Sequence, residues 1–301
     1  MKSSNQQVLF PILAEKGITL YVKREDALHP FISGNKYRKL KYNLLEAQKL
    51  GLKTVLTFGG AFSNHIAATA YAGKASNLRT IGVIRGDELV DKWRDNPTLR
   101  VANENGMQLK FVSREWYRDK ENAEAIALLV QEFGDFYRIP EGGTNSLAVK
   151  GCEEILTQND AVFDVICTCV GTGGTIAGII NACLPHQSVI GFPAVKGDFL
   201  KKDICKFVEN LNWDLETNYN FEGYGKVSKA LIDFINEFKL QTTIPLDPVY
   251  TGKMMYGILD LIAKDYFTPG TKILAIHTGG LQGIAGMNML LKKKNLPLLR
   301  L

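Results

Sequence analysis

The sequence carries little net charge and no long apolar run. Its 301 residues have a formal net charge of +5, and the densest basic run, residues 292–294, is typical of a solvated helix end. A broad basic face with interleaved aromatic residues is absent, which argues against a nucleic-acid partner. The longest apolar stretches, residues 161–170 and 176–180, are too short to span a bilayer, and residues 1–7 are too polar for a signal peptide. We therefore expect a cytoplasmic protein with no membrane partner.

Cysteine is also scarce, with five residues in the chain. An odd number without extracellular signals argues against a disulfide framework. Cys167 and Cys169 lie two positions apart in an apolar segment, so both side chains face the same side of a strand. A metal site there would need further ligands at suitable spacing, and the nearest histidine in sequence is His186. We expect core cysteines and no metal site.

Short β-rich segments alternate with longer helical segments in a chain of ordinary globular composition, with 46% hydrophobic and 22% charged residues. Strands are expected at residues 20–23, 54–58, 80–84, 108–112, 136–139, 162–169, 188–192 and 272–277. Helices are expected at residues 36–50, 64–75, 97–104, 120–132, 145–158, 175–182, 227–237 and 253–264. The alternation predicts an α/β fold with mostly parallel strands, and the number of strands favours two sheets.

A Gly-rich segment follows the apolar strand expected at residues 162–169. Residues 171–175 read Gly-Thr-Gly-Gly-Thr and lead into a helix, which aims backbone N–H groups and the positive helix end at one point. A dinucleotide fingerprint would need a third glycine where Ile176 stands, and a Walker A loop would need a lysine before Thr175. The segment therefore predicts either a site for a single small phosphate or a purely structural turn.

Two more glycine pairs follow expected strands. Gly59–Gly60 precedes Ser63 and Asn64, and Gly279–Gly280 follows Thr278. Ligands in open α/β sheets bind at the carboxyl ends of parallel strands, so these segments and residues 171–175 could line one cleft. Ordinary turn chemistry is the alternative interpretation.

Lys36 lies at an expected helix start. The positive helix end and partial burial there would lower the pKa of its amine, as Schiff-base chemistry requires. Considered alone, it is one of 36 basic residues and is equally compatible with a surface charge.

Seven motifs occur together in a characteristic order. They are K-R-E-D (23–26), G-N-K-x-R-K (34–39), G-G-x-x-S-N (59–64), E-G-G-T-N (141–145), G-T-G-G-T (171–175), D-P-V-Y-T-G-K (247–253) and H-T-G-G (277–280). As a set they resemble the tryptophan-synthase-β-like, fold type II pyridoxal phosphate enzymes. Within these the chain is similar to the 1-aminocyclopropane-1-carboxylate deaminase and D-cysteine desulfhydrase family, over about residues 22–280.

The resemblance implies a role for each matching residue. Lys36 would bind the cofactor as a Schiff base and move the substrate's Cα proton. Asn64 would bind the cofactor's ring hydroxyl, and Thr278 would face its ring nitrogen. The phosphate would be held by Lys39 with Gly171, Thr172, Gly173, Gly174 and Thr175. Ser63 would contact the substrate carboxylate or assist proton transfer, and Tyr224 and Tyr250 would project into the substrate pocket. Asn64 and Thr251 are also expected among the substrate-binding residues.

A neutral hydroxyl opposite the ring nitrogen has a chemical consequence. It does not stabilise a protonated ring as a carboxylate would, which favours β-elimination over transamination. The resemblance also implies two open twisted sheets flanked by helices, with the cofactor in the cleft between domains. The large domain would comprise residues 1–46 and 150–301, and the small domain residues 47–149. A homodimer is expected by analogy with the family.

The residue types at two positions distinguish the deaminase branch of this family from the desulfhydrase branch. The deaminases carry Glu and Leu where this chain has Thr251 and Thr278, so the desulfhydrase branch is favoured, with D-cysteine giving pyruvate, ammonia and hydrogen sulfide. Phe62 departs from the family's Gln before the Ser-Asn pair, which leaves the substrate's size and identity open. His65 either adds a substrate-binding donor or is a satisfied helix histidine.

Three alternatives remain. The chain could be a 1-aminocyclopropane-1-carboxylate deaminase or another pyridoxal-phosphate-dependent amino-acid lyase. In a different class, it could bind the cofactor without turnover. Intact Lys36, Ser63, Tyr224 and Tyr250 argue for an enzyme acting on a small amino acid.

Overall fold

The computed structural model describes residues 2–32, 34–197 and 199–300. Its strands are β1 (Asn5–Val8), β2 (Thr19–Lys23), β3 (Thr54–Gly59), β4 (Arg79–Arg85), β5 (Met107–Val112), β6 (Tyr137–Ile139), β7 (Val165–Val170), β8 (Ser188–Pro193), β9 (Trp213–Leu215) and β10 (Lys272–Ile276). Its α-helices are α1 (Pro11–Glu15), α2 (Asn35–Lys49), α3 (Asn64–Ala75), α4 (Pro97–Glu104), α5 (Arg114–Arg118), α6 (Ala123–Phe133), α7 (Ser146–Glu153), α8 (Gly174–Ala182), α9 (Phe199–Ile204), α10 (Lys229–Thr242), α11 (Thr251–Ala263) and α12 (Gly283–Lys293).

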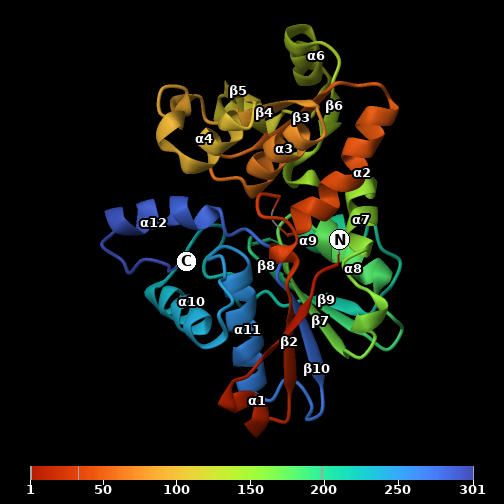
Figure 1. Ribbon diagram of the computed structural model, residues 1–301, viewed down its shortest axis with the longest axis vertical. Coiled ribbons are helices and arrows are strands. Elements are labelled where there is room, and N and C mark those ends of the chain that lie inside the picture. The colour runs from red at the N-terminus through yellow and green to blue at the C-terminus, as the bar shows by residue number, and fades with distance from the viewer. Residues whose placement is uncertain (1, 33, 198, 301) are drawn as a thin grey trace.

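The strands form two sheets, as the alternating pattern predicted. The six-stranded sheet has the order β1-β2-β10-β7-β8-β9, and the four-stranded sheet has the order β5-β4-β3-β6. Every strand pair is parallel except β1 with β2. Figure 1 shows the smaller sheet with α3, α4 and α6 in the upper lobe and the larger sheet in the lower lobe. The α/β prediction is confirmed.

Both faces of the larger sheet are buried. Side chains of successive strand residues point to opposite faces, so alternate residues of one strand belong to different cores. Ile273 and Ala275 belong to the core beneath α10 and α11, whereas Leu274 and Ile276 belong to the core beneath α8. Cys167 and Cys169 face the α10–α11 side together and are free thiols, so the prediction of core cysteines is confirmed. Among the described helices none is long and apolar enough to cross a membrane.

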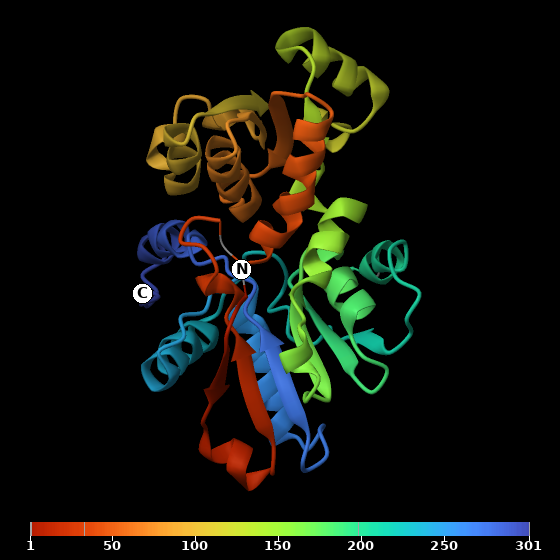
Figure 2. The same cartoon turned by 45° about the vertical axis from the view of Figure 1, so that its right-hand side comes forward.

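Helix α2 connects the two lobes (Figure 2). Leu40, Leu44 and Ala47 pack with residues of the smaller sheet's core, so the apolar side of α2 belongs with that sheet. The strands of the larger sheet lie within residues 1–46 and 150–301 and those of the smaller sheet within 47–149. These domain limits remain a proposal, and both cuts fall inside helices, α2 and α7.

Several elements were not expected from the sequence. Strand β1, with the sequence Asn-Gln-Gln-Val, has no apolar alternation and forms because it pairs with β2. The short elements α1, α5, α9 and β9 were also missed. Residues 292–294 were interpreted as a helix end, and they lie at the end of α12. The helix expected over residues 145–158 ends at Glu153 and is followed by a separate turn at Gln158–Asp160.

Candidate active site

A cavity of about 720 Å³ lies between the two lobes. Its walls include the loops that follow β3, β4, β7 and β10, together with the start of α2. Strands β7 and β10 are neighbours in the larger sheet, so their loops emerge side by side at its carboxyl edge. The cleft expected from the three Gly-rich segments is therefore present.

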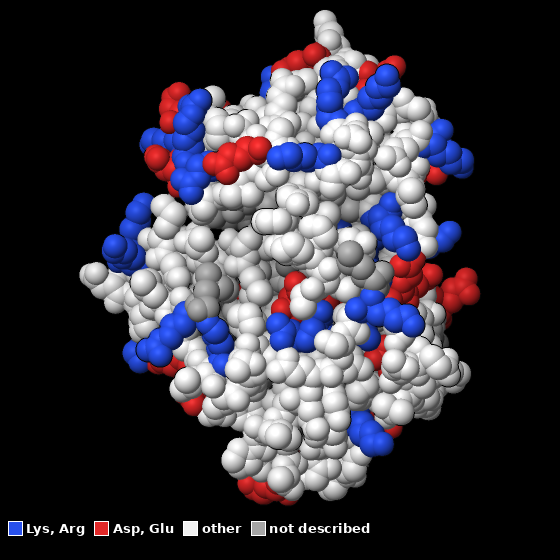
Figure 3. Space-filling view, in the orientation of Figure 1, with Lys and Arg blue, Asp and Glu red and all other residues white. Residues whose placement is uncertain are grey.

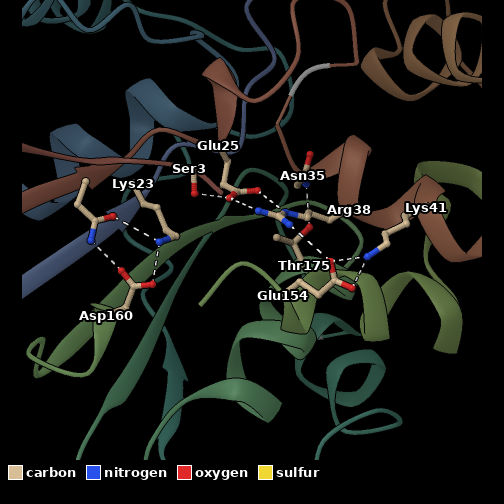
Figure 4. A network of polar contacts seen from close by, with 10 residues as sticks. Ser3, Lys23, Glu25, Asn35, Arg38, Lys41, Glu154, Asp160 and Thr175 are labelled. Atoms are coloured by element: carbon tan, nitrogen blue, oxygen red, sulfur yellow. Dashed lines mark hydrogen bonds and ion pairs between the residues drawn. The ribbon is translucent and has the colours of Figure 1, made fainter. Parts of the chain in front are cut away.

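A buried polar network fixes the start of α2 (Figure 4). Glu25 is fully buried and accepts two hydrogen bonds from the Arg38 guanidinium, at 2.9 and 3.0 Å. Arg38 also lies 3.6 Å from a Glu154 carboxylate oxygen on α7. Asn35 Nδ2 donates to Thr175 Oγ1 at 2.8 Å and so joins α2 to α8. These contacts set the position of the first turn of α2, which carries two cavity lysines.

Lys36 is half-buried in the cavity wall, and its Nζ donates to Asn35 Oδ1 at 3.1 Å. Burial lowers the pKa of this amine below its ordinary value. A neutral amine is the nucleophilic form of lysine, so Lys36 has the environment that carbonyl chemistry needs.

Lys39 lies one turn further along α2. Its Nζ donates to Gly142 O at 2.9 Å and to Thr144 Oγ1 at 3.0 Å, and lies 3.4 Å from Thr172 Oγ1. Burial and the neighbouring charge of Lys36 lower the pKa of Lys39 to about 7. A dianion beside this amine would favour its protonated form, so the position suits a phosphate group.

The Gly-rich turn after β7 brings backbone close to the cavity. Gly173 has φ +81°, a conformation that favours glycine, and α8 begins at Gly174. A Cβ atom at Gly174 would lie 3.2 Å from Lys39 Nζ, and one at Gly171 would lie 3.2 Å from the Tyr250 ring. Gly171, Gly173 and their threonine neighbours line the cavity, whereas Gly174 lies just behind it against Lys39.

The start of α3 forms the opposite wall. Ser63 caps this helix by accepting a hydrogen bond from Ile66 N at 3.3 Å, and its hydroxyl proton stays available to the cavity. Asn64 Oδ1 is buried and has no hydrogen-bond partner among the described residues. A buried acceptor of this kind needs a donor, and the ring hydroxyl of pyridoxal phosphate supplies one. The cofactor therefore fits the residues on both walls.

Thr278 lines the cavity at the end of β10. Its Oγ1 lies 2.9 Å from Cys169 Sγ, and burial raises the pKa of that thiol to about 12. The residue that the resemblance places opposite the cofactor's ring nitrogen is therefore part of an uncharged hydroxyl–thiol pair.

Tyr224 and Tyr250 both line the cavity, with ring centroids 6.1 Å apart in an edge-to-face arrangement. Burial raises the pKa of both hydroxyls, so they are neutral donors. Lys253, which the sequence analysis did not single out, is buried and donates to Asn220 O and Gly223 O at 2.8 Å each. It anchors the loop that carries Tyr224.

Thr251 is the one predicted substrate contact that lies away from the cavity. It is fully buried, and its Oγ1 donates to Asp247 Oδ1 at 2.8 Å and accepts from Asp247 N at 2.9 Å. The expectation of direct substrate contact is not supported, because the hydroxyl is engaged within its own turn. Thr251 helps to hold the turn that places Tyr250.

His65 lies at the back of the cavity and is 2% exposed. Thr57 Oγ1 donates to Ile139 O at 2.9 Å, so at 2.8 Å it accepts the hydrogen bond from His65 Nε2. This fixes the neutral tautomer, and His65 Nδ1 has no partner among the described residues. Burial holds the pKa of His65 well below its ordinary value. The unpartnered Nδ1 is a buried acceptor, so the expectation of an added donor does not fit this geometry.

Phe62 lines the cavity but also contacts the other lobe. A Cβ atom at Gly286 on α12 would lie 2.5 Å from the Phe62 ring, so the ring rests on a glycine. The sequence analysis identified Phe62 as unusual but had no signal for its partner. Arg85, at the end of β4, is a further lining residue that the sequence analysis missed.

The fold and this cavity define a fold type II pyridoxal phosphate enzyme. The family model described as pyridoxal-phosphate dependent enzyme matches residues 8–279, and the chain belongs to this family. Its members use pyridoxal phosphate, so the cofactor expectation is confirmed at the level of the family.

Named relatives narrow the family further. A putative 1-aminocyclopropane-1-carboxylate deaminase of Pyrococcus horikoshii is 36% identical, covering 92% of this chain and 89% of the relative. The bifunctional D-cysteine desulfhydrase/1-aminocyclopropane-1-carboxylate deaminase of Arabidopsis thaliana is 34% identical, covering 89% and 74%. A crystal structure described as an ACC deaminase homologue has a TM-score of 0.80 at 31% identity, covering 94% and 90%. The chain is therefore an enzyme of the deaminase and desulfhydrase family.

Proposed function

We propose that this enzyme catalyses α,β-elimination from a small amino acid, with D-cysteine as the best candidate substrate. The main support is the uncharged Thr278–Cys169 pair, which lies in the wall of the cavity that also contains Lys36. If Thr278 faces the ring nitrogen of the bound cofactor, no carboxylate would hold that nitrogen protonated, which would favour elimination over transamination.

Each residue would have a defined part in the reaction. The α-carboxylate would be bound by the Ser63 hydroxyl and the N–H groups at the start of α3. The bound cofactor would supply the electron sink. The Lys36 amine would remove the Cα proton, and the Cβ–sulfur bond would break with its electron pair leaving on sulfur as hydrogen sulfide. The remaining enamine takes up water to give pyruvate and ammonia.

Deamination of 1-aminocyclopropane-1-carboxylate is the second candidate, because relatives carry that name. Tyr250 lines the cavity and would be available to either reaction. Thr251 would act on the choice of reaction only indirectly, through the turn that places Tyr250, because its hydroxyl is bound to Asp247.

We also propose that the enzyme is a homodimer, which size-exclusion chromatography with light scattering would test.

The test uses protein reconstituted with pyridoxal phosphate. We expect a visible band from the bound cofactor that changes on addition of D-cysteine, with pyruvate and sulfide released in equal amounts. 1-Aminocyclopropane-1-carboxylate should release no 2-oxobutyrate. Release of 2-oxobutyrate without sulfide would replace the first candidate by the second, and turnover of neither would refute both.

Lys36→Ala tests the covalent link. After borohydride reduction, the wild-type chain should gain the mass of the cofactor, and Lys36→Ala should not. Lys49→Ala, at the exposed end of the same helix, is the matched control and should gain that mass. Retention of covalent cofactor by Lys36→Ala would contradict the assignment.

A further inference from the structure

We propose that the cavity also takes amino acids that carry a second anionic group on the side chain and that Arg85 binds this group. This inference rests on the proposed function, because it concerns the same cavity and the same class of amino acid.

Arg85 is placed at the cavity by its strand. It ends β4, the neighbour of β3, whose following loop contains Gly60 and Ser63. Arg85 Nη2 lies 3.7 Å from the position of a Cβ atom at Gly60, so the guanidinium stands beside that loop. The guanidinium carbon also lies 5.7 Å from the Tyr117 ring centroid, which supports its orientation.

The other charges at this rim are paired. Arg114 contacts Glu88 at 2.6 Å, and Lys120 contacts Glu141 at 3.1 Å. Within residues 2–32, 34–197 and 199–300, Arg85 has neither an ion pair nor a hydrogen bond through its side chain. Figure 3 shows basic and acidic residues interspersed over one face of the molecule. Arg85 is therefore an exposed cation of the cavity wall with no ion-pair partner among the described residues.

The α-carboxylate does not require Arg85. The first N–H groups of a helix have no partner within the helix, so those of Asn64 and His65 point out of the end of α3. Together with the Ser63 hydroxyl, they provide donors for one carboxylate. A planar guanidinium prefers a carboxylate, phosphate or sulfonate that accepts two parallel hydrogen bonds. Arg85 is thus suited to an anionic group on the side chain of the substrate.

Such a group could also leave. With O-phosphoserine, the Lys36 amine would take the Cα proton and the Cβ–oxygen bond would break with its electron pair leaving on phosphate. Addition of water to the remaining enamine would give pyruvate and ammonia. No oxidant or reductant is required.

The first experiment measures binding without turnover. Aspartate and asparagine, in both enantiomers, are titrated into the holoenzyme while the cofactor's visible band is recorded. Wild type should bind one enantiomer of aspartate more tightly than the matching asparagine. Arg85→Met should weaken the binding of aspartate about 10- to 100-fold and leave the binding of asparagine unchanged, as expected for loss of a hydrogen-bonded charge pair. Arg79→Met, at the other end of β4, is the matched control and should behave as wild type.

The second experiment compares turnover of O-phosphoserine with that of O-acetylserine, whose substituent is neutral. Arg85→Met should lower kcat/KM only for O-phosphoserine, whereas Arg85→Lys should retain part of it. Equal losses for both substrates would assign Arg85 to the α-carboxylate and overturn the proposal, as would wild-type enzyme with no preference for aspartate. Failure of the proposed function is distinguishable from failure of this inference. If the proposed function is wrong, the wild-type enzyme will eliminate from neither D-cysteine nor either serine ester.

Discussion

Replacement of Asp247 by asparagine tests how the turn before α11 is held. Asp247 is 1% exposed. Its Oδ1 accepts hydrogen bonds from Thr251 N and Thr251 Oγ1, both at 2.8 Å. Its Oδ2 accepts from Val249 N at 2.9 Å and Tyr250 N at 3.0 Å. The carboxylate therefore organises the segment that places Tyr250 in the cavity.

The magnitude follows from this geometry. An asparagine amide can present its oxygen to only one of the two donor pairs, and its NH₂ group then faces the other pair. Two donors lose an ionised acceptor, at about 1.5–3 kcal/mol each, so the free energy of unfolding should fall by about 3–6 kcal/mol. That is a large fraction of the roughly 5–15 kcal/mol typical of a folded protein.

The assay is urea unfolding of the apoprotein, followed by far-ultraviolet circular dichroism. Thr251→Val removes only the hydroxyl from the same turn and should cost about 1–3 kcal/mol, which makes it the matched control. If Asp247→Asn lowers the free energy of unfolding no more than Thr251→Val does, the carboxylate is not the organising group and the reasoning is wrong.

Three further predictions concern Lys39 and Phe62 in the cavity wall. Sulfate, which stays ionised, should bind the apoprotein less tightly as pH rises through about 7, because Lys39 loses its proton there; calorimetry of Lys39→Met should show no such dependence. The pKa of Lys39 in the folded protein lies below its ordinary 10.5, so between these two values the unfolded chain binds more protons than the folded one. The free energy of unfolding of wild type should therefore rise with pH relative to that of Lys39→Met. A fall of wild type relative to Lys39→Met would contradict this. Gly286→Ala should cost about 1–3 kcal/mol in urea unfolding because its Cβ displaces the Phe62 ring. The cost should disappear in the background of Phe62→Ala, and strictly additive losses would show that the two residues do not interact.

Much of the fold could be predicted because periodicity is a local property. The expected strand at residues 54–58 and helix at residues 64–75 match β3 and α3 closely. The strand expected at residues 162–169 was displaced to Val165–Val170, since its first residues form a turn. Strand β1 was missed because its residues become a strand only by pairing with β2.

The candidate site was predicted mainly where one motif supplies both the side chain and its backbone setting. Lys36, Ser63 and the turn at residues 171–175 lie as the motifs suggested. Thr251 does not, because proximity to Tyr250 in sequence said nothing of the direction of its side chain. Arg85 had no motif and was found only from its place in the cavity wall.

The sequence by itself determined the α/β class, the family and several residues of the cavity wall, because these depend on local periodicity and on motifs within short segments. Only the tertiary structure decided which atoms remain free to act. It turned Thr251 inward to Asp247, fixed His65 as a neutral acceptor and placed the Phe62 ring on Gly286. It also left Arg85 without an ion pair among the described residues. Each of these outcomes depends on a contact between segments distant in the chain or on a side-chain direction. A motif does not encode either of them, because both are set by the packing around each side chain in the folded protein.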